Sequence, residues 1–191
     1  MTVRLRVAAL IVAPLLLAGC AAADAGTAAS GSTGHSTAAS TAHSTAASGA
    51  TPPENASMVC SDDIRSKVQQ VLKLPALPPV HSTWMKQVYT CTYDLPMGPM
   101  VLTVQVAATK AAADAAFEER QKATAGATVL NGLGEHAYAT PDGTATVIKD
   151  AMTLTVDTTA LPAVFGAEQQ KRTDLAYEIA SDVLGCWTGN D

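Results

Sequence analysis

Residues 87–106, QVYTCTYDLPMGPMVLTVQV, decide the fold, because they hold two runs with a period of two residues around a turn. The turn is PMGP at 96–99, whose prolines and glycine are typical of tight connections. Each run puts one set of side chains on a single face: Tyr89, Cys91 and Tyr93 in the first, and Met100, Leu102, Val104 and Val106 in the second. The stretch therefore predicts an antiparallel hairpin of two strands.

Two helices are predicted on either side of this hairpin. The first has Ser61 or Asp62 as its N-cap and ends before Pro75. The second follows Thr109, a capping residue, and runs through KAAADAAFEERQKA, which is rich in strong helix formers. The expected inward faces are Ile64, Val68, Val71 and Leu72 in the first helix, and Ala113, Ala116 and Phe117 in the second.

Three further strands and a last helix complete the pattern. The strands are ATVLNGLGEHAYAT, GTATVIKD and AMTLTVD, separated by turn residues at 141–143 and by Asp150. The helix is expected from Glu168 to Leu184, with Gly185 as a left-handed C-terminal stop. Its inward residues, spaced by four, are Leu175, Ile179 and Val183.

The order α-β-β-α-β-β-β-α predicts an α+β fold, with an antiparallel five-stranded sheet and three packed helices. The folded part is expected at residues 58–187, which is the size of one ordinary domain. Residues 188–191 are assigned to a short tail.

Several short motifs give the chain a resemblance to a known family. They are a cysteine opening the first helix (Cys60), CTY on the first strand, VLNGLGEHAY at 129–138 and the LAxxIA pattern of the closing helix at 175–180. In these it resembles actinobacterial lipoproteins of the domain-of-unknown-function 3558 type. Those proteins in turn resemble extracellular sensor domains of receptor kinases. The resemblance implies the fold and no chemical activity.

The same resemblance implies a disulfide between Cys60 and Cys91, which would tie the first helix to the first strand. In an exported domain at least two of the three cysteines beyond Cys20 are expected to pair. Cys186 is then left as a candidate free thiol. The alternatives are a buried cysteine packed as a small hydrophobe, a disulfide to Cys60 instead, or a link between two chains.

The N-terminus has the layout of a secretory signal. Arg4 and Arg6 precede an apolar run at 7–18 that is too short to span a bilayer as a helix. The run ends in Leu17-Ala18-Gly19-Cys20, which looks like a bacterial lipobox. This likeness implies cleavage after residue 19 and attachment of a diacylglyceryl group and a fatty acid such as palmitate to Cys20. The alternative is an ordinary signal peptide with a chance cysteine.

Residues 20–57 are almost entirely Ala, Ser, Thr and Gly, with a short repeat at HSTAASTA and HSTAASGA. Such a segment has too little apolar surface to offset the entropy of ordering, so a disordered tether is predicted. His35 and His43 have no nearby carboxylates or thiols to complete a metal site, so the segment is interpreted as a soluble spacer.

The net charge argues against nucleic acid as a partner. Without residues 1–19, ten basic residues face seventeen acidic ones, a net charge of −7. An acidic chain without a basic cluster is a poor nucleic-acid binder. The predicted partners are therefore the membrane, through the lipid anchor, and an unknown small apolar ligand, wall component or protein.

No catalytic motif stands out. The GLG at 132–134 lacks the third glycine and the helix of a dinucleotide loop, so a strand bend is expected there. Asp62 and Asp63 suit the positive end of a helix dipole. His81 and His136 are lone histidines, usually structural. No cofactor and no metal site are predicted.

A proline-stiffened connection, KLPALPPVHSTWM at 73–85, is unusually apolar for a loop. We expect it either to cover the core or to form the rim of a ligand groove through Leu74, Leu77, Val80, Trp84 and Met85. The sequence thus favours a lipid-anchored, non-catalytic binding or sensor-like domain on the outer face of the cell membrane. The alternative is an envelope hydrolase or thiol enzyme that uses His136, His81 or Cys186.

Overall fold

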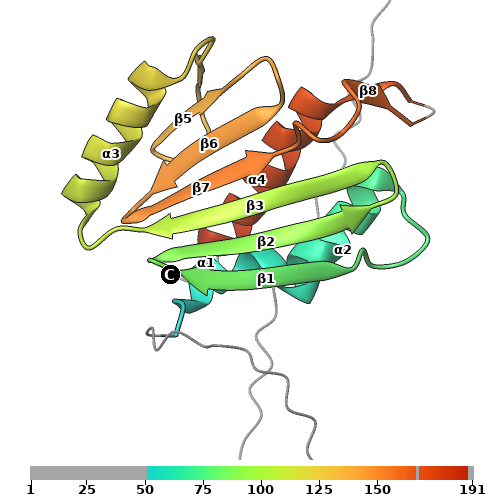
Figure 1. Cartoon of the computed structure of the whole chain (residues 1–191), viewed down its shortest axis with the longest axis horizontal. Coiled ribbons are helices and arrows are strands. Elements are labelled where there is room, and N and C mark those ends of the chain that lie inside the picture. The colour runs from blue at the N-terminus through green and yellow to red at the C-terminus, as the bar shows by residue number, and fades with distance from the viewer. Residues whose placement is uncertain (1–50, 167, 189–191) are drawn as a thin grey trace, which may run out of the picture.

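A seven-stranded antiparallel sheet is the centre of residues 51–166 and 168–188, the part of the chain that the computed structural model describes (Figure 1). The spatial order is β1-β2-β3-β7-β6-β5-β4. The strands are β1 (Val80–Met85), β2 (Val88–Leu95), β3 (Gly98–Val106), β4 (Thr128–Leu130), β5 (His136–Ala139), β6 (Thr144–Lys149) and β7 (Met152–Asp157). The α+β class predicted from the sequence is confirmed, but the sheet has seven strands instead of five.

The predicted hairpin forms as β2 and β3, which pair antiparallel from Val88↔Gln105 to Leu95↔Gly98. The side chains expected on one face point into the core. Cys91, Tyr93, Met100, Leu102 and Val104 are all fully buried. Alternation of period two therefore fixed both the strands and their inward face.

One of the two additional strands is β1, where the sequence predicted a connection. Pro78 and Pro79 precede the strand and do not interrupt it, in keeping with the confinement of proline to strand starts and edges. β1 joins β2 through Lys86 and Gln87, which both have positive φ, the geometry of a tight hairpin turn. The prediction of a loop over this segment is wrong.

The other additional strand arises because ATVLNGLGEHAYAT breaks into β4 and β5. Gly132 and Gly134 have φ of 79° and 59°, so the expected bend at GLG is confirmed. At Gly134 a Cβ atom would lie 2.6 Å from Val147 Cγ1, so only glycine fits.

The first two predicted helices form with the expected caps. α2 (Asp62–Leu72) is capped by Ser61, whose hydroxyl accepts from the Ile64 amide. α3 (Lys110–Ala123) is capped by Thr109, whose hydroxyl accepts from the Ala112 amide. Ala116 is exposed, against expectation, because α3 buries only the narrow stripe of Ala113 and Phe117.

The last helix, α4 (Arg172–Thr188), begins and ends later than predicted. The residues before it form β9 (Gln170–Lys171), which pairs with β8 (Val164–Phe165) in a small separate sheet. Gly185 lies inside the helix and is not a stop, because the helix continues through the buried Cys186 and Trp187. The Trp187 indole donates to the Asn55 carbonyl at 2.8 Å, which anchors this end to α1 (Glu54–Ser57).

The two faces of the sheet are covered unequally. Figure 1 shows α2 and α4 behind the strands, and the main core lies between them and the sheet. On the opposite face, α3 packs over the β5–β6 end, where Phe117 contacts Tyr138 and Ile148 in a small second core. Most of that face carries none of the described helices.

The folded unit includes α1, ahead of residue 58, and its Ala56 is fully buried. A one-turn 3₁₀ helix, η1 (Met58–Cys60), leads from α1 into α2. The predicted signal peptide, the predicted lipidation site Cys20, most of the predicted tether and the end of the predicted tail lie outside the described residues.

Candidate functional site

A cavity of about 310 Å³ lies where the C-terminal end of α2 meets the β2–β3 turn and the β8–β9 hairpin. Three segments far apart in the sequence form it. Its apolar wall consists of Val71, Leu72, Met97 and Phe165, and its rim includes Lys73, Glu168 and Gln170. The cavity is therefore a mainly apolar hollow with a charged edge.

Local sequence explains why each segment reaches the cavity. Val71 and Leu72 are the last apolar residues on the inward face of α2. Lys73 then takes a left-handed conformation and its amide bonds to Gln70, which ends the helix and turns the chain away. The cavity thus opens where the helix stops before it can cover the end of the sheet.

Two polar contacts lie at the rim of the cavity, one from the end of α2 to the β8–β9 hairpin and the other from that hairpin to α4. The Lys73 ammonium donates to the Glu168 carboxylate, and both side chains are largely exposed. Gln170 donates from its amide to Glu178 on α4 at 3.4 Å. An exposed ion pair of this kind is worth at most about 1 kcal/mol, so it would yield readily to a bound molecule.

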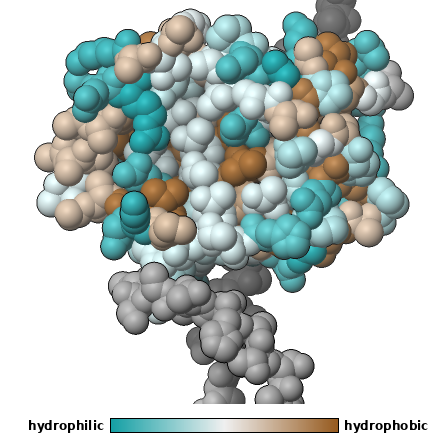
Figure 2. Space-filling model, in the orientation of Figure 1, coloured by the Kyte–Doolittle hydropathy of each residue, from teal (hydrophilic) through white to brown (hydrophobic). Residues whose placement is uncertain are grey.

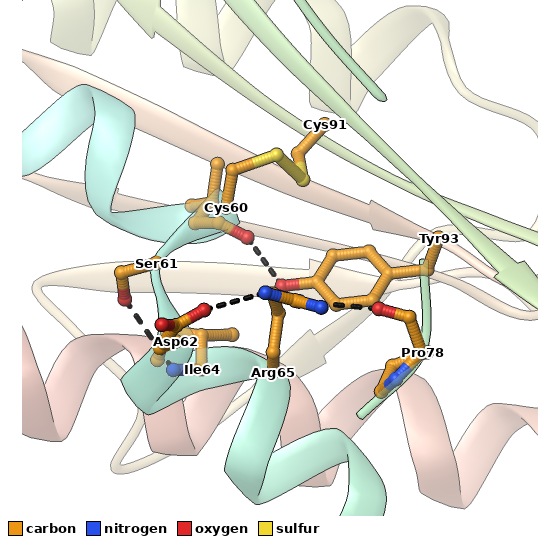
Figure 3. Close-up of a disulfide and its surroundings, with 9 residues drawn as sticks. Cys60, Ser61, Asp62, Ile64, Arg65, Pro78, Cys91 and Tyr93 are labelled. Carbon is orange, nitrogen blue, oxygen red and sulfur yellow. Dashed lines mark hydrogen bonds and ion pairs between the residues drawn. A yellow bond between two sulfur atoms is a disulfide. The ribbon is translucent and has the colours of Figure 1, made fainter. Parts of the chain in front are cut away.

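A disulfide and two hydrogen bonds join the N-terminal end of α2 and the 3₁₀ helix before it to the sheet and the loop beside it (Figure 3). Cys60 and Cys91 form the disulfide that the resemblance implied, which links η1 to β2. The Tyr93 hydroxyl donates to the buried Val59 carbonyl, and burial raises the pKa of this phenol above its ordinary value. The Arg65 side chain donates to the Pro78 carbonyl at 3.1 Å. These contacts fasten the N-terminal end of α2 to the sheet.

The five residues expected as a ligand rim do not gather around this cavity. Val80 and Trp84 are half-buried on the helix-covered side of β1, whereas Met85, 63% exposed, points to the other side. Leu74 and Leu77 lie in the loop before the strand. Because a strand alternates its side chains, these residues divide between two faces and form no single rim.

The candidate catalytic residues are also far apart. His81 is on β1 and pairs with Asp94 at 2.9 Å, while His136 is on β5 beside the Phe117 ring. Five strand spacings separate β1 from β5, which is about 24 Å. Cys186 is buried in α4, on the other side of the sheet. No two of these three residues share a site.

An ion-pair cluster near His136 has a structural role. Lys110 on α3 pairs with Asp114 at 2.9 Å and with Glu135, which precedes β5. A hydrogen bond from Lys110 lowers the pKa of Glu135, and the Asp150 amide donates to the same carboxylate. The cluster therefore ties the β4–β5 connection to α3 and to the β6–β7 turn.

The cavity residues were not singled out from the sequence as a site. Val71 and Leu72 were expected as core, and Met97 and Phe165 had no signal beyond isolated hydrophobicity. Cavities of about 300 Å³ and above are the usual size for small-molecule sites. Only the three-dimensional structure brings these residues together.

Within the described ranges, no group of three His, Cys, Asp or Glu side chains is placed to hold a metal ion. Nor does any helix in that part of the chain have the length and apolar character to cross a membrane. In comparisons with known proteins, no family model, no curated protein and no solved structure matches the chain.

Proposed function

We propose that the protein is a lipid-anchored lipoprotein of the cell envelope whose folded domain binds a small apolar ligand without catalysing a reaction. The single observation that carries the ligand-binding part is the cavity of about 310 Å³ between α2, the β2–β3 turn and the β8–β9 hairpin. The cavity thus replaces the β1 segment as the proposed place of binding.

The chemistry of the cavity favours an apolar molecule with a polar end. Leu72, Met97 and Phe165 offer a wall that an apolar group can contact, and removing apolar area from water contributes about 25 cal/mol per Å². Methionine adapts its shape to different ligands, which suits a site of irregular outline. Lys73 and Glu168 at the rim can pair with a polar end group that stays in water.

The separation of the polar candidates supports binding rather than catalysis. Acid–base catalysis needs groups within hydrogen-bonding reach of one substrate atom. His81, His136 and Cys186 lie on β1, β5 and α4 and do not contact the cavity. No observation favours the hydrolase or thiol-enzyme alternative.

The anchor part of the proposal rests on the sequence. We assign residues 1–19 to a cleaved signal peptide, Cys20 to the lipidated N-terminus and residues 20–57 to a tether. The resemblance to actinobacterial lipoproteins of the domain-of-unknown-function 3558 type, and to receptor-kinase sensor domains, supports the same location. A tether would hold the cavity clear of the bilayer and within the wall.

Native mass spectrometry tests ligand binding. The purified protein is exposed to a lipid and cell-wall extract, and a bound adduct is expected. Met97→Trp fills the cavity and should abolish the adduct, whereas the matched control Met85→Trp changes an exposed residue of β1 and should retain it. An adduct that survives Met97→Trp would place the ligand elsewhere, and a bare mass for the wild type would argue against a carrier.

Membrane fractionation tests the anchor. Two or three acyl chains hold a protein on a bilayer far more firmly than one. The wild type should remain on membranes after a salt wash, and Cys20→Ala should be released. Retention of Cys20→Ala on washed membranes would contradict lipid anchoring.

A further inference from the structure

A row of threonines crosses the face of the sheet opposite the main core. The strand register pairs Thr83↔Thr90, Thr90↔Thr103, Thr103↔Thr155 and Thr155↔Thr146. Residues paired in this way share one face, so five neighbouring strands each contribute one threonine to a continuous row. We call it the threonine ladder.

The ladder is open to solvent along most of its length. Thr83 is exposed, Thr90, Thr103 and Thr155 are half-buried, and only Thr146, at the α3 end, is buried. Figure 2 shows this face with a largely pale centre, the colour of intermediate hydropathy. No described helix crosses the β1–β2–β3 part of the face.

The charge on this face limits what can bind there. The outward positions of the five ladder strands carry no Lys, Arg or Glu, although exposed sheet faces and edges normally carry such residues. The charged groups lie in the neighbouring rows and beyond: His81 paired with Asp94, Asp157, and Arg120 of α3, which donates to Gln105 at 2.9 Å. Because the charges beside the ladder have both signs and the net charge of the chain is acidic, a neutral partner suits the ladder better than an anionic polymer.

The size of the face also limits the partner. The faces of β1, β2, β3 and β7 together span roughly 460 Å² in the plane of the sheet, from the strand lengths, the strand spacing and the rise per residue. A stable protein interface needs about 800 Å² on each side. A second copy of the chain or a folded protein is therefore a poor fit, whereas a thin extended chain is a good one.

The side chains of the threonine ladder then indicate which kind of extended polymer would bind. Each threonine offers a hydroxyl that both donates and accepts, next to a methyl group. A pyranose ring likewise combines hydroxyls that donate and accept with apolar C–H faces. Because neighbouring strands lie about 4.8 Å apart, a threonine hydroxyl and methyl recur along the ladder at nearly the length of one sugar in an extended glycan.

We propose that the threonine ladder is a docking surface for a neutral, extended polysaccharide. The chain would lie across the strands, from β1 towards β7, with successive sugars over Thr83, Thr90, Thr103 and Thr155. This surface is separate from the cavity, since the ladder and the α2 side are opposite faces of the sheet. The inference therefore stands whether or not the cavity binds a ligand.

Calorimetric titration of the purified protein with cellohexaose and chitohexaose tests the proposal, with an oligogalacturonate as the anionic comparator. At least one neutral glycan should bind, and the anionic one should not. The double variant Thr90→Val/Thr103→Val keeps the β-branched shape and removes two hydroxyls, so affinity should fall at least about tenfold. Thr128→Val, an exposed strand threonine outside the ladder, is the matched control and should bind like the wild type.

Amide NMR of the same titration locates the glycan, with shifts expected at ladder residues of β1, β2 and β3. The proposal is overturned if neither neutral glycan binds, if the oligogalacturonate binds as tightly, or if the double variant keeps wild-type affinity. Circular dichroism establishes that the double variant is folded before its affinity is compared.

Discussion

The two faces of the sheet are built from the same strands but differ in what they do. The helix-covered face carries Leu102, Leu154 and Val156, all fully buried, and is fastened by a disulfide. The other face carries the threonine ladder on the same strands and is covered by α3 near β5, β6 and β7, where Arg120 of α3 also reaches Gln105 on β3. The main core and the disulfide thus lie on one face, and the other is the face that we propose contacts a partner.

Substitutions at two neighbouring positions of β3 should show the largest difference in stability between the two faces. Leu102→Ala leaves a cavity in the main core and should lower the free energy of unfolding by about 2–5 kcal/mol. Thr103→Val, one residue along and on the open face, should change it by less than about 0.5 kcal/mol. Urea denaturation measures both values, and similar losses in the two variants would remove the distinction between the faces.

The disulfide should have the next largest effect. Cys60 and Cys91 are 31 residues apart, and a loop of this size contributes about 3–4 kcal/mol in the chain-entropy model. The double variant Cys60→Ser/Cys91→Ser should lose that amount in urea denaturation. The control Cys186→Ser tests whether the loss comes from the disulfide or from sulfur removal alone, since Cys186 is not in the disulfide. An unchanged unfolding midpoint in the double variant would show that the disulfide does not stabilise the fold.

The buried tyrosine gives a smaller effect. Tyr93→Phe leaves the Val59 carbonyl without its donor, and a buried unsatisfied acceptor costs about 1–3 kcal/mol. Tyr177→Phe removes a hydroxyl from an exposed tyrosine on α4 and should be close to neutral. Thermal unfolding followed by circular dichroism compares the two, and equal midpoints would mean that the Tyr93 hydrogen bond contributes nothing net.

The smallest predicted effect is on the pH dependence of the free energy of unfolding. Burial raises the pKa of Asp182, against the opposing charge of Lys67, and it also raises the pKa of Glu178. A carboxyl whose pKa is higher in the folded state stabilises the fold below its unfolded pKa and loses that contribution as pH rises through the folded pKa. Asp182→Asn should therefore raise stability near pH 7, by less than about 1 kcal/mol because the group is half-exposed.

The pH dependence of urea denaturation checks this expectation. The Asp182→Asn advantage should shrink as pH falls through the raised pKa of the folded state, and it should be absent below the ordinary pKa of an aspartate. Glu119→Gln, which removes an exposed carboxylate on α3, is the control for the loss of one surface charge. A constant advantage at all pH values would exclude the ionisation of Asp182 as its cause.

Local signals in the sequence predicted most of the framework. Ser61 and Thr109 cap their helices as expected, and the alternation of Cys91 and Tyr93 correctly gave the inward face of β2. These features succeed because the interactions that determine them lie within a few residues.

The errors arise where distant contacts override a local signal. β1 was missed because its hairpin turn uses Lys86 and Gln87, without the Asn-Gly that marks such turns. Gly185 was expected to end α4, but Trp187 carries the helix on through its bond to Asn55. The cavity could not be predicted because Leu72, Met97 and Phe165 meet only in the fold.

A crystal structure of the protein purified from the cells that produce it tests ligand binding most directly. Our account predicts electron density for an apolar molecule between α2 and the β8–β9 hairpin, in contact with Leu72, Met97 and Phe165. If Met97 and Phe165 instead close onto Leu72 and leave no space, the cavity does not bind a ligand and the proposed function is contradicted.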